Sequence, residues 1–483
     1  MAATDKDPTE AILLVEQTIG TFNQIVVGQE GQMVPVPGYP DQPTLAERVK
    51  QNLKPSTDAA AGFAAQAAAS AKAADDAAKL ASQISGLETV ADAIGMAALP
   101  LPDVWAPLSD SLRLITGYGR DVLVGSDVVA RMVNFSRNST ATYIGKDGQL
   151  KTAAANEPRF EKEGLLIEGN STNIVPRSTD MSLSPWYTGF GGSGKAPVIT
   201  SNYGVAPDGS QSASRVVLDK GAGTDPSNDS TVMCTLSTVA GTTYTLSVWM
   251  KSTDGAATQK VSLSLNGAMA TTVTVTGEWR RYSVTALATD SSRIPRLQLR
   301  GGAGTSDTAD LLAWGWQQEA LPFASSYIPT AGAAVTRAAD EWNIPNKINC
   351  GPAPAMPMSV AVNFTCMGYV SFNNIFVAGD RQLMVYAGTN KLRVEQGGYS
   401  AIDITSNVVG YGGAQNKLRA ACSDSRVACL LNGIMTERSG GTPIAGNGFD
   451  YFGSSKLRNQ FGHIRDLRIW RIALTNEQLK AIA

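Results

Sequence analysis

Short runs of alternating apolar and polar residues fill the chain from about residue 183 onward, and this pattern restricts the fold more than any other feature. Side chains along a β-strand point to opposite faces in turn, so alternation predicts strands with one face on a core. Glycine and Asn/Asp turns separate the runs, and the chain contains 47 glycines. Short strands joined by tight turns are typical of antiparallel sandwiches and jelly rolls. The predicted strands are TYTLSVWMK, KVSLSLN, TTVTVTGEWRRYSVTA, RLQLRG and LLAWGWQQE, then MSVAVNFTC, NIFVAG, QLMVYAG, KLRVEQ, KLRAACS, RVACLLNG and HIRDLRIW.

Residues 56–85 have a different composition, with 14 alanines between Ala59 and Ala81. Alanine is the best helix former, so a helix is predicted here. Its apolar stripe is narrow, and a lone helix of this kind buries too little surface to be stable. Several copies packed around a shared axis would bury it, which predicts a coiled-coil stalk. A flexible Ala-rich linker is the alternative.

Helix signals also mark both ends of the chain. Asp7-Pro8 is a suitable helix start, and the proline-rich residues after it predict a docked, extended segment. Thr475 is a predicted N-cap for a final helix over NEQLKAIA. The predicted fold class is therefore mainly β with a helical N-terminal part: an Ala-rich coiled-coil stalk followed by two antiparallel β-sandwich (jelly-roll) domains.

The composition argues against several classes of function. The net charge is −2 and 17% of residues are charged, whereas a nucleic-acid surface needs a basic excess. No run of apolar residues is long enough for a transmembrane helix, and MAATDKDPTE lacks the features of a signal peptide. Five scattered cysteines without a CxxC pair predict free thiols in a reducing compartment.

Catalytic motifs are not evident, and we predict that the protein is not an enzyme. The one histidine, His463, could be a general base beside Asp466, but a histidine on a strand of the last sandwich is the favoured interpretation. GxSxG, P-loop and dinucleotide motifs are absent, and one histidine makes zinc improbable. Paired carboxylates for glycoside cleavage are common on any surface. The candidates are Asp307 with Asp310, Glu319, and Asp340 with Glu341.

Aromatic residues are the stronger binding signal, because Trp and Tyr rings stack on the apolar faces of sugars. Trp314 and Trp316 are two residues apart and are expected to share one face of a strand, with Trp249 and Trp314 more consistent with a core. Further aromatics of the first sandwich are Tyr203, Tyr282 and Trp279. The candidates for a glycan site are Trp186, Tyr187, Trp316, Tyr369, Tyr386, Tyr399, Tyr411 and Arg458.

No cofactor is predicted, although one loop has the oxygen donors that calcium prefers. DPSNDS places Asp225, Asn228 and Asp229 together. A structural calcium is one interpretation of this loop, and a polar turn is the other.

One polar segment resembles part of a known protein family. Residues 135–180, FSRNSTATYIGKDGQLKTAAANEPRFEKEGLLIEGNSTNIVPRSTD, closely resemble a segment of tail-fibre and tailspike-like proteins of tailed bacteriophages. Residues such as GTTYTLSVWMKS and LLAWGWQQEALPFASSYIPTAGAAVTRAAD resemble a carbohydrate-binding-module-like jelly roll. The ending GFDYFGSSKLRNQFGHIRDLRIWRIALTNEQLKAI resembles concanavalin A-like (laminin G-like) sandwiches. Within the first segment, strands are expected at 140–144 and at GLLIEG, with a turn at 146–148, and the family suggests that such strands pair between subunits.

The resemblance implies a homotrimeric, receptor-binding tail fibre that is located in the virion tail and assembled in the host cytoplasm. Its implied partners are virion tail proteins at the N-terminus and a bacterial surface polysaccharide at the sandwiches. A structural adaptor that holds another tail protein, and a polysaccharide depolymerase, are the alternatives. The expected domains are 1–55 (tail attachment), 56–98 (coiled coil), 99–164 (fibre joint), 165–335 (carbohydrate-binding-module-like sandwich) and 336–483 (lectin-type sandwich).

Overall fold

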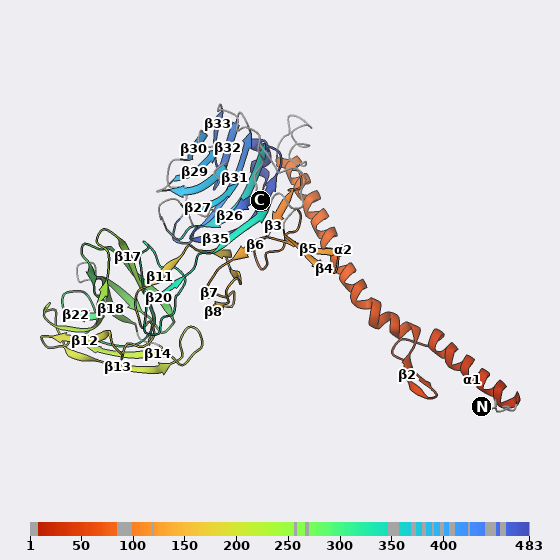
Figure 1. The fold of residues 1–483 in the computed structure, drawn as a ribbon, viewed down its shortest axis with the longest axis horizontal. Helices are drawn as coiled ribbons and strands as arrows, with labels where there is room; N and C mark the ends of the chain where they lie inside the picture. Colours follow the sequence, from red (N-terminus) through yellow and green to blue (C-terminus); the bar gives the residue numbers. More distant parts are fainter. Residues whose placement is uncertain are drawn as a thin grey trace. The chain divides into compact units, whose positions relative to one another are not determined.

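The computed structural model of the 483-residue chain forms two compact units, residues 1–98 and 99–483 (Figure 1). The structure describes residues 8–84, 99–117, 120–255, 258–265, 270–345, 357–368, 373–378, 383–388, 391–396, 400–404, 411–423, 426–439, 451–454 and 460–482. No helix within these residues is both long enough and apolar enough to span a membrane.

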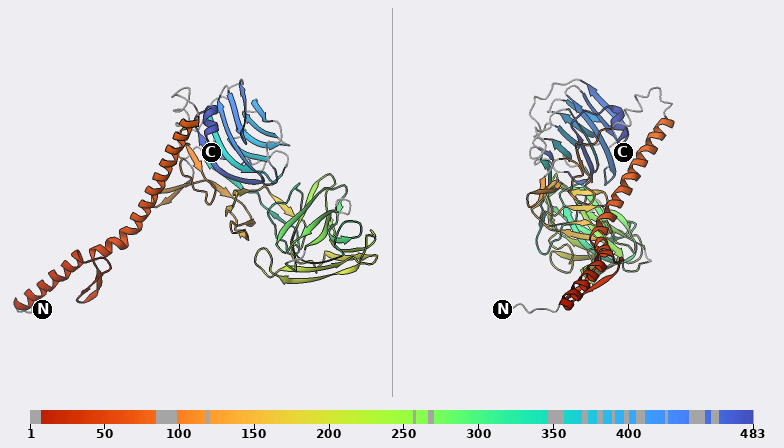
Figure 2. Two further views of the ribbon diagram at one scale, coloured as in Figure 1. Left: turned by 180° about the vertical axis from the view of Figure 1, so that it is seen from behind. Right: turned by 90° about the vertical axis from the view of Figure 1, so that its right-hand side faces the viewer.

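The N-terminal unit is helical. Helix α1 (Pro8–Val27) is followed by a hairpin of β1 (Met33–Val36) and β2 (Tyr39–Pro43), and then by the long helix α2 (Leu45–Ile84) (Figure 2). The Thr44 hydroxyl accepts the Glu47 N–H, as an N-cap residue does, and donates to the Gln29 carbonyl. The predicted boundary at residue 55 is corrected, because α2 runs through it, and the proline-rich segment is a hairpin. The helices are confirmed, whereas the coiled coil remains a prediction.

Residues 186–319 form a sandwich of two five-stranded antiparallel sheets. One sheet has the order β12 (Trp186–Gly191), β15 (Asp229–Cys234), β22 (Pro295–Arg300), β18 (Gln259–Leu265) and β19 (Thr271–Val275). The other has the order β13 (Lys195–Gly204), β14 (Ala213–Asp219), β23 (Thr308–Glu319), β17 (Thr243–Ser252) and β20 (Arg280–Leu287). Two short pairs complete it: β11 (Ser171–Asn173) with β24 (Val335–Arg337), and β16 (Leu236–Ser237) with β21 (Ser292–Arg293). The alternation predicted β17, β18, β19, β20, β22 and β23, whereas β12 to β15 were not among the predicted strands. The core between the sheets contains Leu246, Val248, Leu263 and Leu297.

A second, larger antiparallel sandwich contains an eight-stranded and a seven-stranded sheet. The first contains β33 (Ile434–Ser439), β32 (Arg426–Leu431), β31 (Gln415–Ser423), β26 (Met358–Thr365), β35 (Gly462–Trp470), β10 (Gly164–Ile167) and β9 (Arg159–Glu161), with β3 (Val104–Ala106) beside β35. The second contains β30 (Ser400–Ile404), β29 (Lys391–Gln396), β28 (Leu383–Gly388), β27 (Asn373–Ala378), β34 (Tyr451–Gly453), β25 (Glu341–Pro345) and β6 (Asn134–Ser136). Helix α4 (Asn476–Ala481) follows with the predicted Thr475 cap.

The first part of the unit of residues 99–483 belongs to the second sandwich. This corrects the predicted joint domain of residues 99–164. Val104, Val133 and Leu165 lie in the same core as Val360 and Ile469. The chain therefore begins the C-terminal sandwich, builds the first sandwich, and returns to complete the second. Burial of both faces explains why β10 reads as the unbroken apolar run GLLI.

Strand pairing in the polar segment also differs from expectation. β7 (Ala141–Ile144) forms a hairpin with β8 (Leu150–Ala153), whereas β10 pairs with β9 and with β35 of the same chain. A further hairpin joins β4 (Arg120–Val124) and β5 (Asp127–Met132). Pairing of β10 between subunits is therefore wrong, since both of its edges have partners within the chain.

Candidate functional site

A tight hairpin brings the polar segment against the last strand of the chain. Gly164 pairs with Glu161 across a turn of two residues and has a φ of +133°. A Cβ at Gly164 would lie 2.5 Å from the Ile464 carbonyl oxygen, so only glycine allows this approach. The hairpin side chains are thereby held beside His463 on β35.

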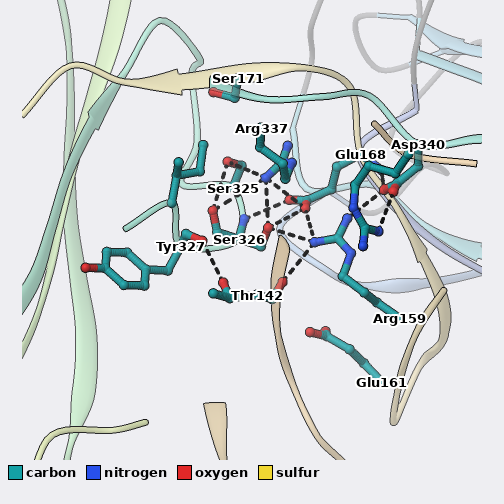
Figure 3. Close-up of polar contacts among 12 residues, drawn as sticks. Thr142, Arg159, Glu161, Glu168, Ser171, Ser325, Ser326, Tyr327, Arg337 and Asp340 are labelled. Carbon is teal, nitrogen blue, oxygen red and sulfur yellow. Dashed lines mark hydrogen bonds and ion pairs between the residues drawn. The ribbon is translucent and has the colours of Figure 1, made fainter. Parts of the chain in front are cut away.

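Two buried carboxylates and three buried arginines join the segments that run between the sandwiches. Figure 3 shows Glu168 and Asp340 with Arg159 and Arg337. The Arg159 guanidinium donates to Asp340 at 2.6 Å and to Glu168 at 2.8 Å. Arg137 donates to the other Asp340 oxygen at 3.0 Å, and Arg337 lies 3.0 Å from Glu168. We call these five residues the ionic joint. Buried charges need paired, hydrogen-bonded partners, and this network supplies them.

Glu168 is held ionised within the ionic joint. Burial alone would raise the pKa of this carboxyl, but Arg337 and Arg159 outweigh burial and lower its pKa to about 2. The Ser326 N–H and hydroxyl donate to Glu168 at 2.7 and 2.5 Å. Removing the charge would leave two buried guanidinium groups facing a neutral side chain.

Arg281 on β20 lies beside the ionic joint. It has no ion-pair partner among the described residues. Its guanidinium carbon lies 4.3 Å from the centre of the Trp249 ring, and it donates to the Ser325 carbonyl and the Ser247 hydroxyl. Its Nε has no hydrogen-bond partner in the part of the chain described. Burial lowers the pKa of Arg281 to about 10, so it stays cationic at neutral pH.

A cavity of about 110 Å³ lies where the polar segment meets both sandwiches. One water needs about 10–15 Å³ of such space, so the cavity has room for several waters or for a small ligand group. Its apolar walls include Leu150, Leu166, Trp249 and Tyr327, and Arg281 lies among them. The remaining lining residues are Thr142, Tyr143, Ile144, Glu161, Glu168, Ala324, Ser325, Ser326, Met367 and His463.

The histidine has partners other than the predicted one. His463 is buried, with Nδ1 2.9 Å from the Thr365 hydroxyl and Nε2 2.9 Å from the Glu161 carboxylate. Asp466 instead pairs with Arg468 and accepts the Trp105 indole N–H. The pairing of His463 with Asp466 is therefore wrong, and its position on a strand of the last sandwich is confirmed.

Two of the predicted sugar-binding tryptophans belong to the core. Trp186 and Trp316 are buried, their ring centres lie 4.8 Å apart, and the Trp186 indole donates to the Arg177 carbonyl. Both rings belong to the core between the sheets and neither lines the cavity, so these two predictions are wrong. Tyr187 is 43% exposed and bonds Thr235, so it remains a surface candidate.

Trp314 and Trp316 lie on opposite faces of β23, contrary to expectation. The register between β17 and β23 shifts between Ser247 and Trp249, because β23 carries one extra residue there. Gly315 at this bulge has a φ of +69°, which favours glycine. Trp314 therefore joins Trp249 and Tyr327 in a small cluster on the far face of the sheet, and Trp316 joins the inner core.

The other aromatics of the first sandwich have defined neighbours. Tyr203 is exposed and stacks under Arg215, whose guanidinium carbon lies 5.1 Å from its ring centre. Trp279 is partly buried beside Lys251, and the Tyr282 hydroxyl donates to the Thr274 carbonyl. None of the three lines the cavity.

Most candidates in the second sandwich cannot be placed as side chains. Tyr369, Tyr399 and Arg458 lie outside the described residues, and Tyr386 is described only as backbone in β28. Tyr411 is half-buried and packs on the core. These sites therefore stay predictions, except that Tyr411 has a packing role.

The predicted calcium loop uses its oxygens internally. Asp225 accepts the Ser227 N–H and hydroxyl, and the Asn228 side-chain oxygen accepts the Ser193 N–H. One Asp229 oxygen accepts from Thr231, while the other is buried without a described partner. These contacts account for a polar turn, and calcium stays a prediction.

Most of the carboxylates predicted for glycoside cleavage have other partners in the structure. Asp307 binds Lys220, and Asp310 forms a 2.5 Å ion pair with Arg215. Asp340 belongs to the ionic joint. Glu319 accepts from Ser325 and Ser171, and Glu341 begins β25. The sequence analysis did not single out Arg281, Glu161 or Glu163. A signal was available for Arg281 alone, because it is an arginine inside the alternating run EWRRYSV.

Comparisons with known proteins give low overall similarity. No protein-family model matches the chain, and no curated protein matches it. Domains LG4-5 of the mouse laminin alpha1 chain align at 10% identity, with a TM-score of 0.21, over 49% of this chain and 84% of that one. The CBM22-1-CBM22-2 tandem of Paenibacillus barcinonensis Xyn10C aligns at 10% identity and a TM-score of 0.22, over 63% and 97%. The LG1-3 region of the laminin alpha2 chain aligns at 10% identity and a TM-score of 0.20, over 75% and 72%.

Proposed function

We propose that this chain is a receptor-binding tail-fibre protein of a tailed bacteriophage that binds a bacterial surface glycan and does not cleave it. The cavity at the polar segment carries the glycan-binding part of the proposal. The phage setting rests on the resemblance of residues 135–180 to tail-fibre proteins.

The cavity has the two kinds of surface that a sugar needs. Trp249, Tyr327 and Leu150 form an apolar wall for the C–H face of a sugar ring, while Arg281 and Glu161 offer a donor and an acceptor for its hydroxyls. Its small size suits one terminal sugar residue or a substituent of one. Glycoside cleavage needs a protonated carboxyl as general acid. Binding without cleavage fits Glu168, which lines the cavity with Glu161, because Arg159 and Arg337 keep it ionised.

The helical unit supports assembly and attachment. Eight large apolar side chains of α1 are exposed in the single chain: Ile12, Leu13, Leu14, Val15, Ile19, Phe22, Val26 and Val27. Exposed apolar surfaces of this kind mark interaction sites. We assign α1 to contacts with virion tail proteins and α2 to a three-stranded coiled coil. Three weak sugar sites in one trimer would then act together through avidity.

The test uses the full-length protein and a panel of immobilised bacterial capsular polysaccharides and O-antigens, read by biolayer interferometry. Arg281→Gln should weaken binding at least ~10-fold, since a hydrogen bond from a charged group is worth about 1.5–3 kcal/mol. Arg280→Gln is the matched control, because Arg280 is its exposed neighbour on β20 and does not line the cavity.

Light scattering on the same samples should give three chains per particle. Normal binding by Arg281→Gln would refute the cavity as the glycan site. If the folded trimer binds no polysaccharide on the panel but is retained by isolated tail proteins, the adaptor function replaces the receptor function.

A further inference from the structure

We propose that Glu161, Glu163 and His463 bind a divalent transition-metal cation of the Zn²⁺ or Mn²⁺ class at the edge of the cavity. The site rests on the geometry of these three side chains. Its role in holding a ligand rests, in addition, on the proposed glycan function.

The three side chains are brought together by the tight hairpin and β35. One ligand atom from each lies within 4.8 Å of the others. Zinc lies about 2.0–2.2 Å from nitrogen and carboxylate ligands, so neighbouring ligand atoms are about 3 Å apart. Glu161 Oε2 and His463 Nε2, 2.9 Å apart, already have this spacing. Glu163 needs only a side-chain rotation, because it lies in the two-residue turn between β9 and β10.

The imidazole is oriented as a metal-binding histidine is. The Thr365 hydroxyl contacts Nδ1 at 2.9 Å and also accepts the His463 backbone N–H at 2.9 Å. A ligating histidine donates its second ring N–H to such an oxygen, which directs the lone pair of the other nitrogen toward the metal. Here that other nitrogen is Nε2, and it points at Glu161.

The charges at this point are unbalanced in the described part of the chain. No lysine or arginine lies within ion-pair distance of Glu161 or Glu163 there, in contrast to the carboxylates of the ionic joint. The Ile144 N–H donates to the other Glu161 oxygen, and Glu163 makes no hydrogen bond among these residues. Two carboxylates beside one imidazole gain stability from a shared cation.

The cavity gives the cation room for exchangeable ligands. Glu161 and His463 both line it, so coordination positions that the protein leaves open would face Arg281 and the apolar wall. Hydroxyl and carboxylate oxygens are suitable ligands for these positions. The inferred ligand class is therefore a sugar with vicinal hydroxyls or an acidic group, held by the cation on one side and by Arg281 on the other.

The test starts with full-length, chelator-treated protein and the metals alone. Equilibrium dialysis against Zn²⁺, Mn²⁺ or Ca²⁺ with elemental analysis should show one Zn²⁺ or Mn²⁺ per chain. Glu163→Gln should weaken this binding at least ~10-fold, the loss expected when a metal site is impaired. Because Glu163 has no described partner to lose, this variant should fold. Glu278→Gln, which changes an exposed glutamate outside the site, should alter metal binding less than ~2-fold.

The possible results separate the metal site from the proposed glycan function. Unchanged affinity in Glu163→Gln, or stoichiometric Ca²⁺ without Zn²⁺ or Mn²⁺, overturns the site. Stoichiometric Zn²⁺ or Mn²⁺ that is lost in Glu163→Gln supports it, even if no polysaccharide binds, in which case only the proposed function fails. Polysaccharide binding that a chelator abolishes supports both.

Discussion

Replacing Glu168 by glutamine keeps the shape of the side chain and removes one negative charge from the ionic joint. The pKa of Glu168 falls from 4.5 to about 2 in the folded chain, because the attraction of Arg337 and Arg159 exceeds the effect of burial. A pKa change of one unit corresponds to about 1.36 kcal/mol, so the charge stabilises the fold by about 3 kcal/mol at neutral pH. Breaking a buried ion pair at one partner costs about 3–5 kcal/mol, in agreement with this value.

The pH dependence gives this prediction its sharpest form. Because the folded-state pKa is lowered, the stabilisation is complete above pH 4.5 and is lost as the pH falls toward 2. The free-energy difference between wild type and Glu168→Gln should therefore decrease from about 3 kcal/mol at pH 7 to roughly 1.4 kcal/mol at pH 3. Urea unfolding followed by tryptophan fluorescence measures both values.

The control is Glu278→Gln, which changes an exposed glutamate and should alter the unfolding free energy by less than ~0.5 kcal/mol. Equal stability of Glu168→Gln and wild type at pH 7 would refute the reasoning. So would a difference that stays constant between pH 7 and pH 3, since it would arise from packing and not from the charge.

Two further substitutions test the first sandwich. Trp316→Ala should lower the unfolding free energy by about 3–5 kcal/mol, because it empties a fully buried site. Tyr187→Ala, at an exposed ring, should cost far less. If the two variants lose similar stability in thermal unfolding, Trp316 is not a core residue. Gly315→Ala should cost more than Gly148→Ala, because both glycines have a positive φ but only the Gly315 Cβ would meet Trp249, at 2.8 Å. Equal losses in urea unfolding would argue against the close contact.

The strands could be predicted because they depend on local pattern. Runs such as TYTLSVWMK and HIRDLRIW became β17 and β35, since alternation suits a strand with one face on a core. The final helix was predicted for an equally local reason: Thr475 and Gln478 form a capping box across one turn. Four cysteines within the described residues are free, as predicted, and are buried.

The binding residues could not be predicted in the same way. Trp186 and Trp316 were assigned to a surface because aromatic residues bind sugars, but the same rings also fill cores. Arg281, Glu161 and His463 come together only when β20, β9 and β35 are in place. Each of these residues is ordinary within its own sequence segment.

By itself the sequence determined the class of fold, the alternating strands of both sandwiches and the capped final helix, because alternation and capping act over a few residues. Only the tertiary structure decided which face of a strand is buried: the bulge at Gly315 places Trp314 and Trp316 on opposite faces despite their spacing. It also decided that Glu168 meets Arg337 and Asp340 meets Arg137, because a buried charge takes its partner from whichever segment packs against it.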